Sequence, residues 1–213
     1  MPTTETFKLP TKRKNLFLRV AKGHFATNHS HTNYYIDVTT QKARLSEAKA
    51  VAKELLPYYD ANTIVDTILC LDGTQVIGAC LADELTREDF TNMNAHQTIY
   101  VVTPEHTTGS QLLFRDNIIP MITGKHVLVL AASVTTGFTA QSAIEAVAYY
   151  GGKVVGVSAI FATVDQVEGH AVHAAFDPND LPEYASFSAS ECPLCKQKQK
   201  IDALVNSFGY SRL

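Results

Sequence analysis

The sequence predicts an α/β protein in which helices flank a parallel sheet and both ends of the chain form a small hood. Strand-like and helix-like patterns alternate through the middle of the chain, as in folds with a parallel sheet. Of the 213 residues, 46% are hydrophobic and 18% are charged, which suits a sizeable core. The ends differ in composition: His, Asn, Thr and Tyr are frequent up to about residue 40, and Pro and Cys recur from residue 176. We expect one domain over residues 1–213.

The first half of the sheet region starts with a helix. Between residues 42 and 58 the apolar residues recur on one helical face, and Pro57 marks the end of that pattern. Residues 63–71 are apolar and β-branched, which is typical of a buried strand. Asp72-Gly-Thr74 then predicts a turn, and residues 76–85 predict a helix.

The second half repeats the strand-helix alternation around one long polar connection. A connection of that length in a compact domain is usually functional or mobile. Two glycines predict the C-terminal cap of the last helix. The expected elements are a strand at 98–103, the connection at 104–117, a strand at 126–130, a helix at 139–150 capped by Gly151-Gly152, and a strand at 154–161.

A turn rich in threonine follows the strand that starts at His126. Its hydroxyl groups, the backbone N–H groups near Gly137 and the start of the next helix all suit a phosphate. The alternative is an ordinary helix start with a threonine cap. The predicted phosphate-binding residues are Ser133, Thr135, Thr136, Gly137, Phe138 and Thr139.

This run from His126 to Thr139 resembles the signature of type I phosphoribosyltransferases. Residues 23–37 resemble the N-terminal segment of orotate phosphoribosyltransferases, and residues 71–78 stand where that family has its pyrophosphate loop. Residues 103–115 stand where it has a mobile catalytic loop. The tail Cys192-Pro-Leu-Cys-Lys196 looks like that of a divergent bacterial branch described as orotate phosphoribosyltransferase-like. The resemblance covers about residues 15–165.

The resemblance implies a fold, an activity and a set of site residues. The expected activity is binding of a ribose 5′-phosphate, either 5-phosphoribosyl 1-pyrophosphate (PRPP) or a nucleotide. With Mg²⁺, a phosphoribosyl group would be transferred to a pyrimidine base such as orotate. The resemblance also implies a homodimer. It assigns pyrophosphate to Asp72, Gly73 and Thr74, the base to Tyr34 and Tyr35, and catalytic roles to His106 and Arg115.

The chain departs from the family pattern at its charged groups. Ala131 and Ala132 stand where the family has two acidic residues that hold the ribose hydroxyls. The predicted mobile loop lacks the family's lysine and leaves only His106 and Arg115 for the departing pyrophosphate. Fixed charges normally stabilise this reaction, and each 1.36 kcal/mol of barrier is about tenfold in rate. The alternative is therefore a catalytically degenerate regulatory protein that binds PRPP or a nucleotide on the same fold.

Two groups of histidines and cysteines stand outside these motifs. His170-x-x-His173 and Cys192-x-x-Cys195 together could complete a tetrahedral zinc site, or the thiols could pack a C-terminal turn beside solvated histidines. His24, His29 and His31 could supply cationic or acid–base groups, or form a polar surface turn.

Charge and hydropathy exclude several classes of function. The net charge of −3 gives no reason to expect nucleic acid or an anionic membrane as a partner. No apolar run approaches the roughly 20 residues of a membrane span, and the N-terminus lacks the form of a signal peptide. We therefore expect a cytoplasmic protein whose four cysteines are thiols or metal ligands rather than disulfides.

Overall fold

The computed structural model describes residues 6–9, 13, 16–59, 62–87, 93–95, 98–107, 111–206 and 208–213. The chain divides into two compact units. Residues 41–175 form what we call the sheet unit, and residues 1–40 with 176–213 form the hood unit. The hood unit consists of the two terminal segments for which the sequence analysis expects a hood. That the two units make one domain stays a prediction.

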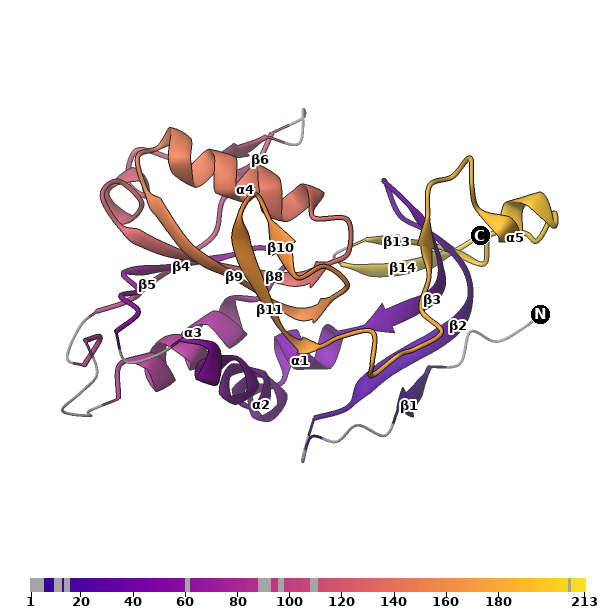
Figure 1. Ribbon diagram of the computed structural model, residues 1–213, viewed down its shortest axis with the longest axis horizontal. Coiled ribbons are helices and arrows are strands. Elements are labelled where there is room, and N and C mark those ends of the chain that lie inside the picture. The colour runs from indigo at the N-terminus through magenta and orange to yellow at the C-terminus, as the bar shows by residue number, and fades with distance from the viewer. Residues whose placement is uncertain are drawn as a thin grey trace. The chain divides into compact units, whose positions relative to one another are not determined.

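A six-stranded sheet with the order β10-β11-β9-β8-β4-β5 organises the sheet unit (Figure 1). Strands β5, β4, β8 and β9 are parallel neighbours, which confirms the predicted parallel sheet. All residues of β4 are buried, as in a central parallel strand. The strands are β4 (Thr67–Cys70), β5 (Tyr100–Val102), β8 (His126–Val134), β9 (Lys153–Ala162), β10 (Gln166–Val167) and β11 (His170–Phe176).

Helices cover both faces of this sheet. Helix α3 (Gln75–Leu85) links β4 to β5, and α4 (Phe138–Tyr149) links β8 to β9. The two connections lead in opposite directions from the neighbouring strands β4 and β8, so right-handed crossovers place their helices on opposite faces. Figure 1 shows α4 on one face, and α3 with α2 (Leu45–Leu55) on the other. The strand order therefore reverses between β4 and β8, which is where open α/β sheets bind ligands.

Several boundaries differ from the predicted ones because long-range pairing decides them. Strand β8 continues to Val134, since Ser133 and Val134 pair with residues of β9. The predicted helix at 42–58 is divided into α1 (Thr39–Ala43), α2 and the 3₁₀ turn Leu56–Tyr58. The predicted polar connection contains the hairpin of β6 (Glu105–His106) and β7 (Leu112–Leu113), and the 3₁₀ turn Ile119–Met121 follows it.

Apolar side chains from both sheet faces and the covering helices form the core of the sheet unit. Val127 and Val129 of β8 pack in one buried cluster with Ala143 and Val147 of α4. A polar pair is also buried: the hydroxyl groups of Tyr59 and Ser158 lie 2.5 Å apart. Burial raises the pKa of Tyr59, so its hydroxyl stays protonated and available for this hydrogen bond.

The hood unit contains a second sheet with the order β12-β3-β2-β13-β14, to which β1 adds beside β2. The basic residues Arg19 and Lys22 belong to strand β2 of this sheet. Strand β13 runs parallel to β2, so the last part of the chain completes a sheet begun near the N-terminus. The elements are β1 (Phe7–Leu9), β2 (Leu18–Ala26), β3 (His31–Asp37), β12 (Ser186–Phe187), α5 (Pro193–Lys196), β13 (Ala203–Asn206) and β14 (Gly209–Arg212).

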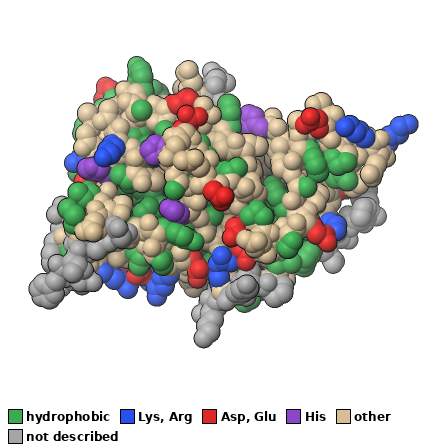
Figure 2. All heavy atoms as spheres, in the orientation of Figure 1, with side chains coloured by type: hydrophobic (Ala, Val, Ile, Leu, Met, Phe, Trp, Pro, Cys, Tyr) green, Lys and Arg blue, Asp and Glu red, His purple; other side chains and the backbone are tan. Residues whose placement is uncertain are grey.

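The distribution of surface charge and the lengths of the helices relate to two classes of partner, nucleic acids and membranes. Figure 2 shows acidic and basic side chains next to each other at several places on one face, so the described residues there do not form a surface of a single charge sign. Among the described residues, no helix is both long enough and apolar enough to span a bilayer.

Candidate functional site: two loops at the reversal of strand order

The loop between β8 and α4 presents backbone N–H groups at the point where the strand order reverses. Gly137 caps α4 with a φ of 79°, and the first helical hydrogen bond runs from the Gln141 N–H to the Gly137 carbonyl at 2.8 Å. The N–H groups of Phe138, Thr139 and Ala140 precede that bond and have no acceptor inside the helix. A Cβ atom at position 137 would lie 3.1 Å from Cγ2 of Val167, so glycine suits both the backbone angle and the space.

Hydroxyl groups surround the same loop. The Thr163 hydroxyl donates to the carbonyl of Thr135 at 2.9 Å and fixes the backbone where β8 ends. Within the described part of the chain, the hydroxyls of Thr135, Thr136 and Thr139 make no hydrogen bond, and Thr136 is exposed. Ser133 is exposed but lies within β8 rather than in the loop, which corrects its expected position. The phosphate-binding role of these residues and of the half-exposed Phe138 stays a prediction.

The second loop, Asp72 to Thr74, follows the neighbouring strand β4. Asp72 and Gly73 have φ values of 55° and 80°, so the chain turns sharply there. Thr74 is fully buried, and its hydroxyl lies 2.8 Å from the Leu71 carbonyl and 2.9 Å from the Leu130 carbonyl. That side chain fastens the loop to β8. Both contacts engage the Thr74 hydroxyl, and the pyrophosphate role that the resemblance implies for Thr74 stays a prediction.

Asp72 is the only carboxylate in this loop, and it reaches β8. Burial raises the pKa of Asp72, while the Ala132 N–H donated to its carboxylate and the nearby Lys42 and His106 lower it. The Lys42 ammonium also donates to the Asp72 backbone carbonyl at 2.8 Å. A carboxylate therefore lies against Ala132 although the chain has no acid at that position. Lys42 supplies a cation that the loop sequence lacks.

Of the two residues predicted to be catalytic, His106 lies in β6 and Arg115 follows the β6–β7 hairpin. His106 is exposed, and its charge lowers the pKa of Asp72. Arg115 instead forms a two-point ion pair with Glu105, with Nη2 to Oε2 at 2.6 Å and Nε to Oε1 at 3.0 Å. This hydrogen bonding lowers the pKa of Glu105. Arg115 is thus held by Glu105, and the catalytic roles of both residues stay predictions; residues 108–110 lie outside the described residues.

Comparisons with known proteins agree with this geometry. No family model matches the chain. An orotate phosphoribosyltransferase of Chlorobium phaeobacteroides is 27% identical over 185 residues, which is 85% of this chain and 86% of that protein. The chain is a divergent orotate phosphoribosyltransferase-like protein.

Two solved structures share the type I phosphoribosyltransferase fold of this orotate phosphoribosyltransferase-like chain. Leishmania donovani UMP synthase is 20% identical with a TM-score of 0.54, over 76% of this chain and 34% of that one. Mycobacterium tuberculosis orotate phosphoribosyltransferase, solved in complex with PRPP, is 18% identical with a TM-score of 0.50, over 70% of this chain and 83% of that one. At these identities the likeness concerns the fold.

The two tyrosines predicted to bind the base are buried in the hood unit of this phosphoribosyltransferase-like protein. Tyr34 is 7% and Tyr35 is 8% exposed, and as neighbours in β3 they point to opposite sheet faces. The Tyr34 hydroxyl donates to Glu183 at 3.0 Å. The Tyr35 ring packs against Phe25 and Tyr210, and burial raises the pKa of Tyr35 to about 12. At most one of them could face a given base, and its role stays a prediction.

The structure does not bring together the two pairs of the predicted zinc site. His170 and His173 lie three residues apart in strand β11, so they point to opposite faces and do not converge on one ion. The His173 ring stacks on Tyr58 with ring centroids 4.4 Å apart. Cys192 and Cys195 lie instead with His24 and His31, which the sequence analysis noted only as members of a histidine cluster. His29 of that cluster is not part of the group.

Proposed function

We propose that this chain binds PRPP or a nucleotide, with the 5′-phosphate in the loop from Thr135 to Thr139. The observation that carries the proposal is the loop itself: N–H groups without helical acceptors, a glycine cap and unbonded hydroxyls at the reversal of strand order. The Mycobacterium structure of the same fold was solved with PRPP, which supports this choice of ligand.

The electrostatics of the loop suit a phosphate monoester. The helix N-terminus carries about half a positive charge and favours a nearby anion by about 0.3–1 kcal/mol at an exposed site. Each N–H bonded to a charged oxygen contributes more, about 1.5–3 kcal/mol. Several such donors around Gly137 would hold the phosphate without a basic side chain.

The second loop would hold the rest of the ligand. The Asp72 carboxylate lies next to the Ala132 N–H. It would replace the two acidic residues that the family has at positions 131 and 132, and would accept hydrogen bonds from the ribose hydroxyls. A single carboxylate together with substrate phosphates also suits Mg²⁺, which would neutralise charge on the pyrophosphate. Lys42, which contacts this loop, and His106, whose charge acts on Asp72, would stabilise the charge that develops on this leaving group.

The reaction we propose is transfer of the phosphoribosyl group to a nucleobase, with orotate as the first candidate. The named relative supports orotate, since it is an orotate phosphoribosyltransferase. A regulatory protein that binds PRPP or a nucleotide without turnover is the second candidate. Two observations favour this regulator: alanines stand at the buried positions 131 and 132 where the family has acidic residues, and the Arg115 guanidinium forms an ion pair with Glu105.

Pyrophosphate release separates the two candidates. Purified chain is mixed with PRPP, Mg²⁺ and single bases, beginning with orotate, uracil and adenine, and PRPP binding is measured by calorimetry in parallel. Release with one base supports the transferase, and binding without release for any base supports the regulator. If PRPP, ribose 5-phosphate and nucleotides all fail to bind, the proposed phosphate site is wrong.

A matched pair of variants tests the role of Asp72. Asp72→Asn removes the carboxylate beside Ala132 and should lower turnover, or PRPP affinity in the regulator, by at least about tenfold, or 1.4 kcal/mol. Asp83→Asn makes the same chemical change at an exposed position of α3 and should leave both unchanged. If the two substitutions changed turnover or PRPP affinity equally, Asp72 would have no specific role in ligand binding.

A further inference from the structure

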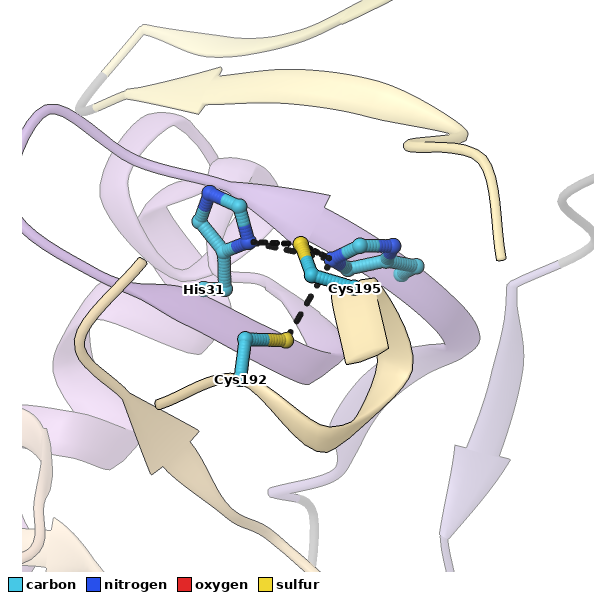
Figure 3. Close-up of side chains that lie close together, drawn as sticks. His31, Cys192 and Cys195 are labelled. Atoms are coloured by element: carbon cyan, nitrogen blue, oxygen red, sulfur yellow. Dashed lines mark hydrogen bonds between the residues drawn. The ribbon is translucent and has the colours of Figure 1, made fainter. Parts of the chain in front are cut away.

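Four side chains of the hood unit direct their metal-binding atoms to one point. His24 is in β2 and His31 is in β3, while Cys192 caps the start of α5 and Cys195 lies within α5 (Figure 3). The two imidazole nitrogens and two sulfurs all lie within 4.8 Å of one another. His24 and Cys192 are fully buried. The group joins residues up to 171 positions apart in the chain.

Four of the six distances between these atoms are close to those in a tetrahedral zinc shell. With Zn–S of about 2.3 Å and Zn–N of about 2.0–2.1 Å, a tetrahedron places N and S about 3.5–3.6 Å apart and two N atoms about 3.3–3.4 Å apart. His24 Nε2 lies 3.5 Å from Cys192 Sγ and 3.6 Å from Cys195 Sγ, and Cys195 Sγ lies 3.3 Å from His31 Nδ1. The two ring nitrogens are 3.1 Å apart.

Hydrogen bonding alone does not account for this convergence. His24 Nδ1 lies 3.0 Å from the Gln199 carbonyl, which only accepts, so Nδ1 carries a proton and, in the neutral ring, Nε2 has the lone pair. One lone pair in the ring plane accepts one hydrogen bond, yet three polar atoms lie within 3.6 Å of Nε2. The Gln199 contact is also the usual outer partner of a metal-bound histidine, since it fixes the ring orientation and the tautomer.

The local backbone holds each ligand in place. The β2–β3 register shifts between Lys22 and Phe25, and such an irregularity re-aims the side chain of His24. The Asp202 carboxylate accepts the His24 N–H at 2.7 Å, and a Cβ on Gly23 would meet that carboxylate at 2.7 Å. On the other side, the Lys196 N–H donates to the Cys192 carbonyl at 3.1 Å and closes the turn that contains both cysteines.

We propose that His24, His31, Cys192 and Cys195 bind one zinc ion as a closed structural site. Two thiolates and two imidazoles in a tetrahedron select zinc among the common divalent metals. Four protein ligands leave no open position for a substrate, in contrast to a catalytic zinc site. The ion fastens the β2–β3 hairpin to the C-terminal segment in a unit whose described residues include a small hydrophobic cluster with Ala21, Phe25, Tyr35 and Ala203 as its buried members. Small units of this kind are often stabilised by a metal.

Metal analysis of the full-length protein, purified under reducing conditions without a metal-affinity tag, tests the proposal. We expect about one zinc ion per chain, lost in Cys192→Ser/Cys195→Ser and in His24→Ala. His29→Ala, in the same hairpin, and His170→Ala/His173→Ala are the controls and should keep the zinc. Absence of zinc from the wild type, together with failure of the reduced protein to take up added Zn²⁺, would overturn the proposal. So would iron bound by the same residues, or loss of zinc in the control at 170 and 173.

Cobalt binding to the wild-type protein tests the same four-ligand site without any substitution, so the result does not depend on whether a ligand variant folds. Co²⁺ added to wild-type protein freed of its metal should give the visible absorption of a tetrahedral site and a thiolate-to-cobalt band, both removed by one equivalent of Zn²⁺. A spectrum of six-coordinate cobalt, or one without a thiolate band, would refute the four-ligand assignment. PRPP binding is measured on the same samples, so that a failure of the proposed function can be told apart from a failure of the zinc proposal. The two are independent, because all four zinc ligands belong to the hood unit.

Discussion

Replacing Gly137 by alanine tests the phosphate loop through two separate measurements. The residue has a φ of 79°, where an L-residue costs about 1–2 kcal/mol. The new Cβ would also lie 3.1 Å from Cγ2 of Val167, a buried residue of the main cluster, and crowding of this kind adds about 1 kcal/mol or more. We expect the free energy of unfolding to fall by about 2–3 kcal/mol, and the thermal midpoint by about 2–4 °C for each kcal/mol.

The effect on ligand binding should be larger than strain alone explains. If alanine disturbs one N–H that contacts a charged phosphate oxygen, the loss is about 1.5–3 kcal/mol, or about 10- to 150-fold in the dissociation constant of PRPP. Calorimetry with PRPP gives this constant, and urea denaturation gives the stability. Gly124→Ala is the matched control: Gly124 has a φ of 69°, nothing within 4 Å of its Cβ position, and a place before the start of β8, at the other end of that strand.

The comparison between the two glycines decides the outcome. Gly124→Ala should lose about 1–2 kcal/mol of stability from the backbone angle and retain full PRPP affinity. Equal affinities for the wild type and Gly137→Ala would show that the loop does not receive the phosphate. Equal losses of affinity in both variants would show that binding merely follows stability.

Three further predictions concern stability. Ser158→Ala leaves the buried Tyr59 hydroxyl without its partner and should lower the free energy of unfolding, measured in urea, by about 1–3 kcal/mol. The control Ser142→Ala, whose hydroxyl contact is exposed on α4, should change this free energy little. Equal losses in the two variants would contradict a stabilising role of the Tyr59–Ser158 hydrogen bond. Burial raises the pKa of Asp72, so its contribution to stability is present below the ordinary aspartate pKa of about 3.9 and is lost as the pH rises through the raised value. Asp72→Asn should therefore raise the thermal midpoint near pH 7 but not below pH 4, and a decrease at pH 7 would refute this. Glu105→Gln should leave the thermal midpoint unchanged because that carboxylate and Arg115 are both largely exposed; a clear decrease would show that the pair stabilises the hairpin.

The sequence was sufficient where local patterns decide the structure. The parallel sheet follows from apolar strands that alternate with amphipathic helices, and the turn around Gly137 follows from a strand, small polar residues and a helix in direct succession. Ser133 was misplaced because the end of β8 depends on pairing with Phe161, which lies far away in the sequence. The position of Lys42 beside Asp72 had no sequence signal, since 30 residues separate them.

The four proposed zinc ligands also depend on contacts between residues far apart in the sequence, which local patterns do not predict. The Cys-x-x-Cys pair is a local signal, but its partners come from the opposite end of the chain. His170 and His173 could have been rejected if the strand β11 had been recognised, because residues three apart in a strand point away from each other. His24 and His31 flank the turn closed by Thr27 and Ser30, which is the one sequence feature that could have suggested them as a pair.

The hood sheet imposes an order on events during synthesis. Strand β13 pairs with β2, and the thiols of Cys192 and Cys195 meet imidazoles from the first part of the chain. A ribosome delivers the N-terminal hairpin long before these partners exist, whereas residues 41–175 emerge as one continuous stretch. The nascent hairpin therefore waits, with positions of both β2 and β3 unpaired, until the segment that contains β12, the two cysteines and β13 has emerged.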